Sequence, residues 1–111
     1  MRSDSTPSAE QVFSASARRV LVLHPGDSQG RMLRSPGLRT GGKFYAFATR
    51  EDVVLKLPAA RVAELIERGA GRPFETKPGR PMREWVRLAG LDADSCVDVL
   101  LEARAFVAGV R

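Results

Sequence analysis

The middle of the chain, residues 29–57, consists of short apolar runs that are interrupted by the pairs Pro36-Gly37 and Gly41-Gly42. Such pairs favour tight turns, and apolar runs of this length suit strands better than long helices. The pattern therefore predicts a meander of three antiparallel strands.

A hairpin is expected at the end of this meander, with strands at residues 43–49 and 53–57 and a polar turn at residues 50–52. Side chains alternate between the two faces of a strand. Tyr45 and Phe47 are therefore expected to share one face of the sheet.

The first helix is expected to begin at Ser8, because Ser8 and Gln11 fit a capping box in which each side chain binds a backbone amide of the other residue. Apolar residues then recur at helical spacing as far as Pro25-Gly26, which ends the element. Residues 20–23, taken alone, could equally form a strand.

Two further helices are expected after the meander. Pro58 can occupy the first turn of a helix that ends at Gly69, and Asp94 is the predicted cap of a helix at residues 95–107. The last helix is apolar over most of its circumference. It is therefore expected either between the sheet and the first helix or at a subunit contact.

Prolines constrain the stretch between the second and third helices. Pro73, Pro78 and Pro81 exclude a continuous helix or central strand there, which leaves a short edge strand around Phe74 and a strand at residues 84–88.

These elements predict an α+β fold, in which an antiparallel sheet of about five strands packs with N-terminal, middle and C-terminal helices. The length of 111 residues suits one domain, predicted over residues 8–111. Residues 1–7 are polar and are predicted to be a disordered tail. Association with a second copy would supplement the small core.

Few residues are available for catalysis or metal binding. The single cysteine, Cys96, and the single histidine, His24, cannot form a disulfide framework or a cysteine and histidine zinc site. Cys96 is expected to be neutral and buried, and His24 has no triad-like context. We expect no catalytic residue, cofactor or metal site, and therefore no enzyme.

The net charge of +5 is concentrated in two segments. Residues 28–50 contain five basic and no acidic residues, and residues 72–87 contain five basic and two acidic residues. Basic side chains favour polyanionic partners. The candidate binding residues are Arg31, Arg34, Arg39, Lys43, Arg80, Arg83 and Trp85.

The chain begins without the apolar core of a secretory signal and contains no apolar run of about 20 residues, so a cytoplasmic location without membrane insertion is expected. Three functions are open. The first is a protein-interaction module, expected to be a homodimer. The second is a sequence-nonspecific nucleic-acid binder that uses segments 28–50 and 72–87. The third is a small-ligand pocket lined by Phe44, Phe47 and Trp85.

Several short motifs resemble a known family. They are Gly30-Arg31-Met32, Ser35-Pro36-Gly37-Leu38, Gly42-Lys43-Phe44-Tyr45-Ala46, Val54-Leu55-Lys56-Leu57, Pro73-Phe74 and Gly79-Arg80-Pro81-Met82-Arg83-Glu84-Trp85-Val86. Together they are similar to the TfoX N-terminal domain family. The Lys-Leu-Pro entry to the second helix and residues 102–108 also resemble the related YjbR-like proteins.

The resemblance implies a sandwich of helix, antiparallel sheet and helix, an arrangement often grouped with the type III secretion chaperones. The best-known members of the family are bacterial regulators of competence genes, so the resemblance implies a regulatory role but little about mechanism. The expectation that this role is non-catalytic comes from the missing catalytic residues. Where the family usually has phenylalanine and glycine after the methionine, this chain has Leu33-Arg34. We therefore expect a different turn at that point.

Overall fold

The computed structural model describes residues 7–32 and 34–109 and confirms the α+β class, with three helices and an antiparallel sheet. In chain order the elements are α1 (Ala9–Leu23), β1 (Ser28–Met32), β2 (Ser35–Thr40), β3 (Lys43–Ala48), β4 (Val53–Lys56), α2 (Ala59–Glu67), β5 (Arg72–Lys77), β6 (Arg80–Leu88) and α3 (Ala93–Ala108). The meander predicted at residues 29–57 thus has four strands, β1 to β4, rather than three.

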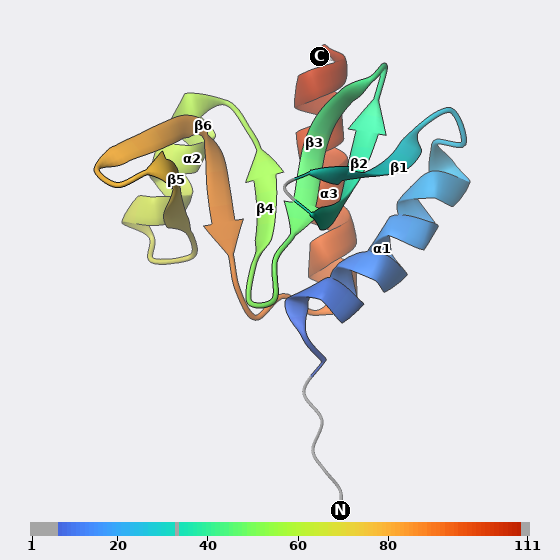
Figure 1. The fold of residues 1–111 in the computed structure, drawn as a ribbon, viewed down its shortest axis with the longest axis horizontal. Coiled ribbons are helices and arrows are strands. Elements are labelled where there is room, and N and C mark those ends of the chain that lie inside the picture. Colours follow the sequence, from blue (N-terminus) through green and yellow to red (C-terminus); the bar gives the residue numbers. More distant parts are fainter. Residues whose placement is uncertain (1–6, 33, 110–111) are drawn as a thin grey trace, which may run out of the picture.

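The six strands lie in the order β1-β2-β3-β4-β6-β5, and every neighbouring pair is antiparallel. In the view of Figure 1, α3 lies behind β3 and α2 lies behind the β5–β6 hairpin. α1 packs against α3. The helices therefore cover one face of the sheet, which we call the helical face; the opposite side is the open face.

The main hydrophobic core lies between the helices and the helical face. Phe13, Ala17 and Val20 of α1 meet Cys96 and Leu100 of α3 there, and all five are buried. α3 also packs against β3 and β4, so it contacts both the sheet and α1. The sequence left two positions for this helix, between the sheet and the first helix or at a subunit contact. Within the chain it packs against both the sheet and α1.

A bulge in β3 changes the predicted alternation of its side chains. Leu38 of β2 is paired with Ala46 but Arg39 is paired with Phe44, so Tyr45 is an extra residue in β3. A bulge of this kind shifts the side chains that follow it to the opposite faces. Tyr45 consequently belongs to the core on the helical face, and Phe47 does not. The prediction that these two residues share a face was wrong.

Phe47 belongs instead to a second hydrophobic cluster, formed on the open face by Phe47, Val54 and Trp85 with Met32, Phe44 and Phe74 packed around them. The Phe47 ring lies 5.6 Å from the Phe74 ring and 5.7 Å from the Trp85 ring, between ring centroids. These separations are typical of favourable aromatic pairs. Both faces of the sheet are therefore packed at its centre.

The helix ends agree with the sequence except at α3. Ser8 and Gln11 form the predicted capping box, and α2 begins after Pro58. α3 begins two residues earlier than predicted, because Asp92 rather than Asp94 accepts the capping hydrogen bond, at 2.7 Å from the Ser95 amide. Both aspartates suit a cap, and sequence alone does not distinguish them.

The proline-rich stretch forms a longer hairpin than predicted, with β5 and β6 joined by a turn at Pro78-Gly79. Pro73 lies in β5, an edge strand. Pro81 lies in β6, but only the part of β6 from Trp85 onward is paired with β4. Neither proline removes a hydrogen bond between central strands, which explains why the sheet tolerates them.

The turn between β1 and β2 places Arg34 at a positive φ of 70°. Glycine adopts this left-handed conformation without strain, so Arg34 has a glycine-like backbone at the position where the TfoX-like pattern has glycine. Leu33 lies outside the described residues.

The predicted N-terminal tail falls mostly outside the described part of the chain, since residues 1–6 are not described. Within the described residues, none of the helices has the length and hydrophobicity needed to cross a membrane.

Gly71 tests how closely the segment before β5 packs against β6. A Cβ atom at Gly71 would lie 2.6 Å from Val86 Cγ2 and 3.1 Å from Leu88 Cδ2, both in the core. Gly71→Ala should therefore lower the free energy of unfolding by about 1–3 kcal/mol, measured by urea denaturation. The control is Gly26→Ala, because a Cβ there meets nothing within 4 Å. Equal stability of the two variants would contradict this packing.

Candidate functional site

The structure distributes the seven candidate residues over both ends of the sheet. Arg31, Arg34 and Lys43 are exposed on the β1–β2 hairpin and at the start of β3, whereas Arg80 and Arg83 are exposed on the β5–β6 hairpin. The strands β3 and β4 separate the two hairpins. The two basic segments therefore do not come together in one site.

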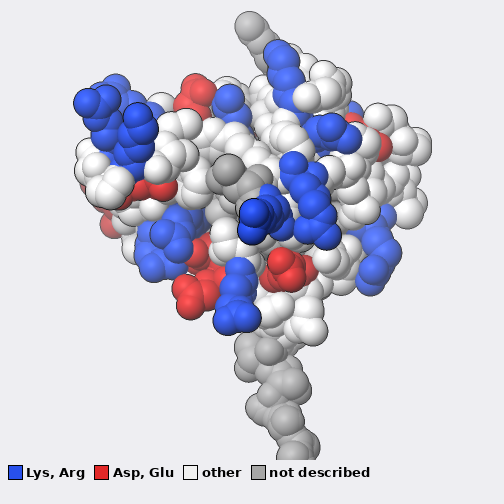
Figure 2. Space-filling model, in the orientation of Figure 1, with Lys and Arg blue, Asp and Glu red and all other residues white. Residues whose placement is uncertain are grey.

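The surface view agrees with this separation. In Figure 2 the Lys and Arg side chains on the face shown form several separate groups, with Asp and Glu side chains among them. A protein that follows a nucleic-acid backbone usually presents its cations as a continuous patch or stripe. The arrangement on this face does not have that form.

Two of the seven residues contribute to packing on the open face. Trp85 belongs to the second cluster and is only 8% exposed. Arg39 lies over the Phe44 ring, with its guanidinium carbon 5.4 Å from the ring centroid, and donates a hydrogen bond to the Gln29 carbonyl at 3.3 Å. Stacking of a nucleic-acid base needs an accessible ring face, which Trp85 does not present.

The predicted ligand pocket beneath Phe44, Phe47 and Trp85 is also filled by this packing. Phe47 is buried, and Met32, Phe44 and Phe74 pack around it. The two hollows described below are lined by neither Phe44 nor Phe47.

An arginine clamp on Asp52 was not predicted from the sequence. Asp52 is 0% exposed and accepts hydrogen bonds from Arg72 at 2.9 Å and from Arg87 at 2.6 Å. The two arginines are 20 and 35 residues away in the chain, so no local pattern reveals the contact. Arg72 and Arg87, two of the basic residues in segment 72–87, therefore form salt bridges with a buried carboxylate.

A second buried network joins β3, α3 and the loop after α1. Asp27 accepts hydrogen bonds from the Tyr45 hydroxyl at 3.0 Å and from Arg104 Nε at 2.7 Å. Burial acts to raise the pKa of the Asp27 carboxyl, but hydrogen bonds from Arg104, Thr40 and Tyr45 outweigh it and hold this pKa below its usual value. Burial, and then the bond to Asp27, raises the pKa of Tyr45.

Cys96 is buried in the main core, as predicted. Burial raises the pKa of its thiol, which favours the neutral form. His24 occupies the C-cap of α1, where its backbone amide donates to the Val20 carbonyl at 2.8 Å. Neither side chain is arranged as a nucleophile or base. Within residues 7–32 and 34–109, no group of three or more His, Cys, Asp or Glu residues could hold a metal ion.

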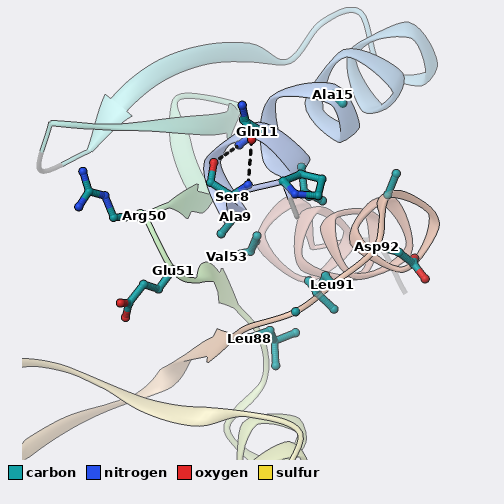
Figure 3. Close-up of a pocket in the computed structure, with 14 residues that line it drawn as sticks. Ser8, Ala9, Gln11, Ala15, Arg50, Glu51, Val53, Leu88, Leu91 and Asp92 are labelled. Carbon is teal, nitrogen blue, oxygen red and sulfur yellow. Dashed lines mark hydrogen bonds between the residues drawn. The ribbon is translucent and has the colours of Figure 1, made fainter. Parts of the chain in front are cut away.

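The larger hollow lies between the first turns of α1 and α3 and the β3–β4 turn, with a volume of about 740 Å³. Its apolar lining includes Ala9, Val53, Leu88 and Leu91, and in Figure 3 the charged side chains at its rim point away from its centre. Those side chains are Arg50, Glu51 and Asp92. Ser8 and Gln11 also line it, and their side chains are bonded to each other's backbone amides in the capping box.

The smaller hollow, which we call the α2 groove, lies between α2 and the β5–β6 hairpin and has a volume of about 440 Å³. Its lining residues are Ala59, Ala60, Val62, Ala63, Ile66, Pro73, Pro81, Met82, Arg83 and Trp85. Met82 is 40% exposed, and the three alanines are exposed as well. The α2 groove is therefore an open apolar surface with one charged residue in its lining.

Comparison of the chain with models of known protein families, with curated proteins and with solved structures finds no match. The similarity to the TfoX N-terminal domain family stays a prediction from the motifs quoted above.

The Asp52 clamp predicts a stability change. Asp52→Asn removes the charge that both Arg72 and Arg87 bind, so the free energy of unfolding should fall by about 2 kcal/mol or more in urea denaturation. Glu51→Gln is the control, because Glu51 is exposed and has no salt bridge with a described residue. A loss no larger than that of the control, within about 0.5 kcal/mol, would contradict the clamp.

The Tyr45 network predicts a pH effect on the only tyrosine of the chain. The folded pKa is raised above the unfolded value of about 10, so this contribution to stability is complete below about pH 10 and is lost as the pH rises through the folded pKa. Absorbance at 295 nm should show ionisation of Tyr45 well above about pH 10 in folded protein and near it in urea. Asp27→Asn should move the folded transition downward. Identical folded and unfolded transitions would contradict the network.

Proposed function

We propose that this chain is a non-catalytic, cytoplasmic protein-interaction module that resembles the TfoX N-terminal domain. The observation that supports the proposal is the α2 groove, where Met82 and the alanines of α2 are exposed beside one another. Exposed apolar surface that is rimmed by polar residues is typical of protein interaction sites. An interaction at this site would bury that surface.

The buried carboxylates also support a binding function rather than catalysis, because arginines of the fold hold them in salt bridges. Asp27 and Asp52, the two buried carboxylates among the described residues, are held by arginines within the fold. Groups that perform acid and base chemistry need access to a substrate and a pKa near the working pH. The lowered pKa of Asp27 and its hydrogen bonds suit a structural role instead.

Site-specific photo-crosslinking tests the proposal. A photoreactive amino acid placed at position 82 should capture a protein from native cytosol after nuclease treatment, and the same group at exposed position 98 on α3 should not. An adduct with the mass of two chains identifies the homodimer form of the proposal. Adducts that are equal at both positions, or that disappear with nuclease, contradict a protein interaction at the α2 groove.

A second candidate is sequence-nonspecific binding of nucleic acid, favoured by the exposed cations on both hairpins. Arg31, Arg34, Lys43, Arg80 and Arg83 form no salt bridge with a described residue. Binding through about five phosphates would weaken by orders of magnitude between low and physiological salt. A mobility-shift titration with duplex DNA at low salt checks it, and the absence of a complex at tens of micromolar protein (about the range expected for weak nonspecific binding) excludes it.

A further inference from the structure

The α2 groove combines an apolar floor with cations on one side only. Arg83 is the single charged residue among the described residues that line it. Arg80 directly precedes the lining residue Pro81, and it is paired with Lys77 across the hairpin. All three cations are exposed, and none forms a salt bridge with a described residue. β5 and β6 also carry two exposed carboxylates, Glu75 and Glu84, against five basic residues, so the β5–β6 side of the groove is basic on balance.

The neighbouring cations are arranged differently. Arg72 and Arg87 bind Asp52, and Arg61 binds Glu102 at 2.8 Å and Glu64 at 2.9 Å. These side chains are therefore engaged in salt bridges within the fold. Among the described cations of α2, β5 and β6, those that form no salt bridge are Lys77, Arg80 and Arg83.

The shape of the α2 groove suits a peptide segment. The exposed face of α2 carries Ala59, Ala60 and Ala63, whose small side chains allow another backbone to approach closely. The volume of about 440 Å³ accommodates a few large apolar side chains, and Met82 offers an adaptable contact at the edge. Grooves of this kind bind amphipathic segments through apolar anchors.

We propose that the α2 groove binds a short protein segment in which apolar side chains are flanked by carboxylates. The apolar side chains contact Met82 and the alanines of α2, and the carboxylates pair with Arg83, Arg80 and Lys77. This inference rests on the proposed function and adds the chemistry of the partner. Charge complementarity of this type gives specificity and speeds association more than it raises affinity.

A peptide selection tests the chemistry of the partner. A phage-displayed library of random 12-residue peptides is selected on the folded protein, and the enriched peptides are synthesised. They should combine Leu, Phe or Met with several Asp or Glu residues. Met82→Asp should abolish their binding, because a carboxylate would then meet the apolar anchors and the acidic flanks. Selection of peptides without an acidic bias overturns the proposal.

A pair of charge-reversal variants locates the carboxylates. The double variant Arg80→Glu with Arg83→Glu should weaken an enriched peptide about tenfold or more, as measured by fluorescence anisotropy. The double variant Arg31→Glu with Lys43→Glu is the control, because it changes the net charge equally at the other end of the sheet, in β1 and at the start of β3. Circular dichroism confirms that both variants fold, and Arg80→Gln with Arg83→Gln supplies a milder change if the first does not.

Each outcome of these measurements decides the proposal. Equal weakening by the two double variants indicates long-range attraction of a polyanion, and tighter binding of duplex DNA than of any enriched peptide indicates a nucleic-acid surface; both overturn it. If the photo-crosslink at position 82 captures a protein but the peptides show no acidic bias, the proposed function stands and this inference fails. If that crosslink captures no protein, the proposed function itself fails.

Discussion

The extra residue in β3 is the constraint on which the rest of the structure depends. Because Tyr45 has no partner of its own in β2, the residues before and after it, Phe44 and Ala46, lie on opposite faces, whereas strict alternation would put them on the same face. Tyr45 reaches Asp27 and Arg104 on the helical face, and Phe47 reaches Trp85 on the open face. The bulge thus allows β3 to supply Tyr45 to the main core and Phe47 to the second cluster.

The second cluster determines what the open face can do. A bare antiparallel sheet with aromatic and basic residues could stack nucleic-acid bases, as in RNA-binding sheets. Here the aromatic rings contact one another, and Arg39 and Lys56 lie over Phe44 and Trp85. The open apolar surface lies instead at the α2 groove, where the β5–β6 hairpin extends beyond the strand that pairs with it.

Features set by neighbouring residues could be predicted from the sequence. The capping box at Ser8 and Gln11 was confirmed, and so were the start of α2 after Pro58 and the α+β class. The cap of α3 and the length of the β5–β6 hairpin were predicted incorrectly, because several residues or pairings satisfy the local rules equally well. The burial of Cys96 was predicted from the usual burial of a free cysteine and was confirmed.

Features that join distant residues could not be predicted. Asp52 meets Arg72 and Arg87, and Asp27 meets Arg104, only after the sheet and helices have formed. The bulge at Tyr45 depends on the pairing of β2 with β3, which composition does not encode. The α2 groove likewise arises from the packing of a hairpin against a helix. Of the candidate residues from the sequence, Arg83 and Trp85 line it and Arg80 lies next to its lining residue Pro81.

Fluorescence of the single tryptophan tests the central claim, that the open face is packed by the second cluster, most directly. Trp85 is the only tryptophan in the chain and is 8% exposed. The account predicts a blue-shifted emission maximum in folded protein and weak quenching by acrylamide, with both changing on unfolding in urea. Emission and quenching typical of a solvent-exposed indole in the folded protein would contradict it.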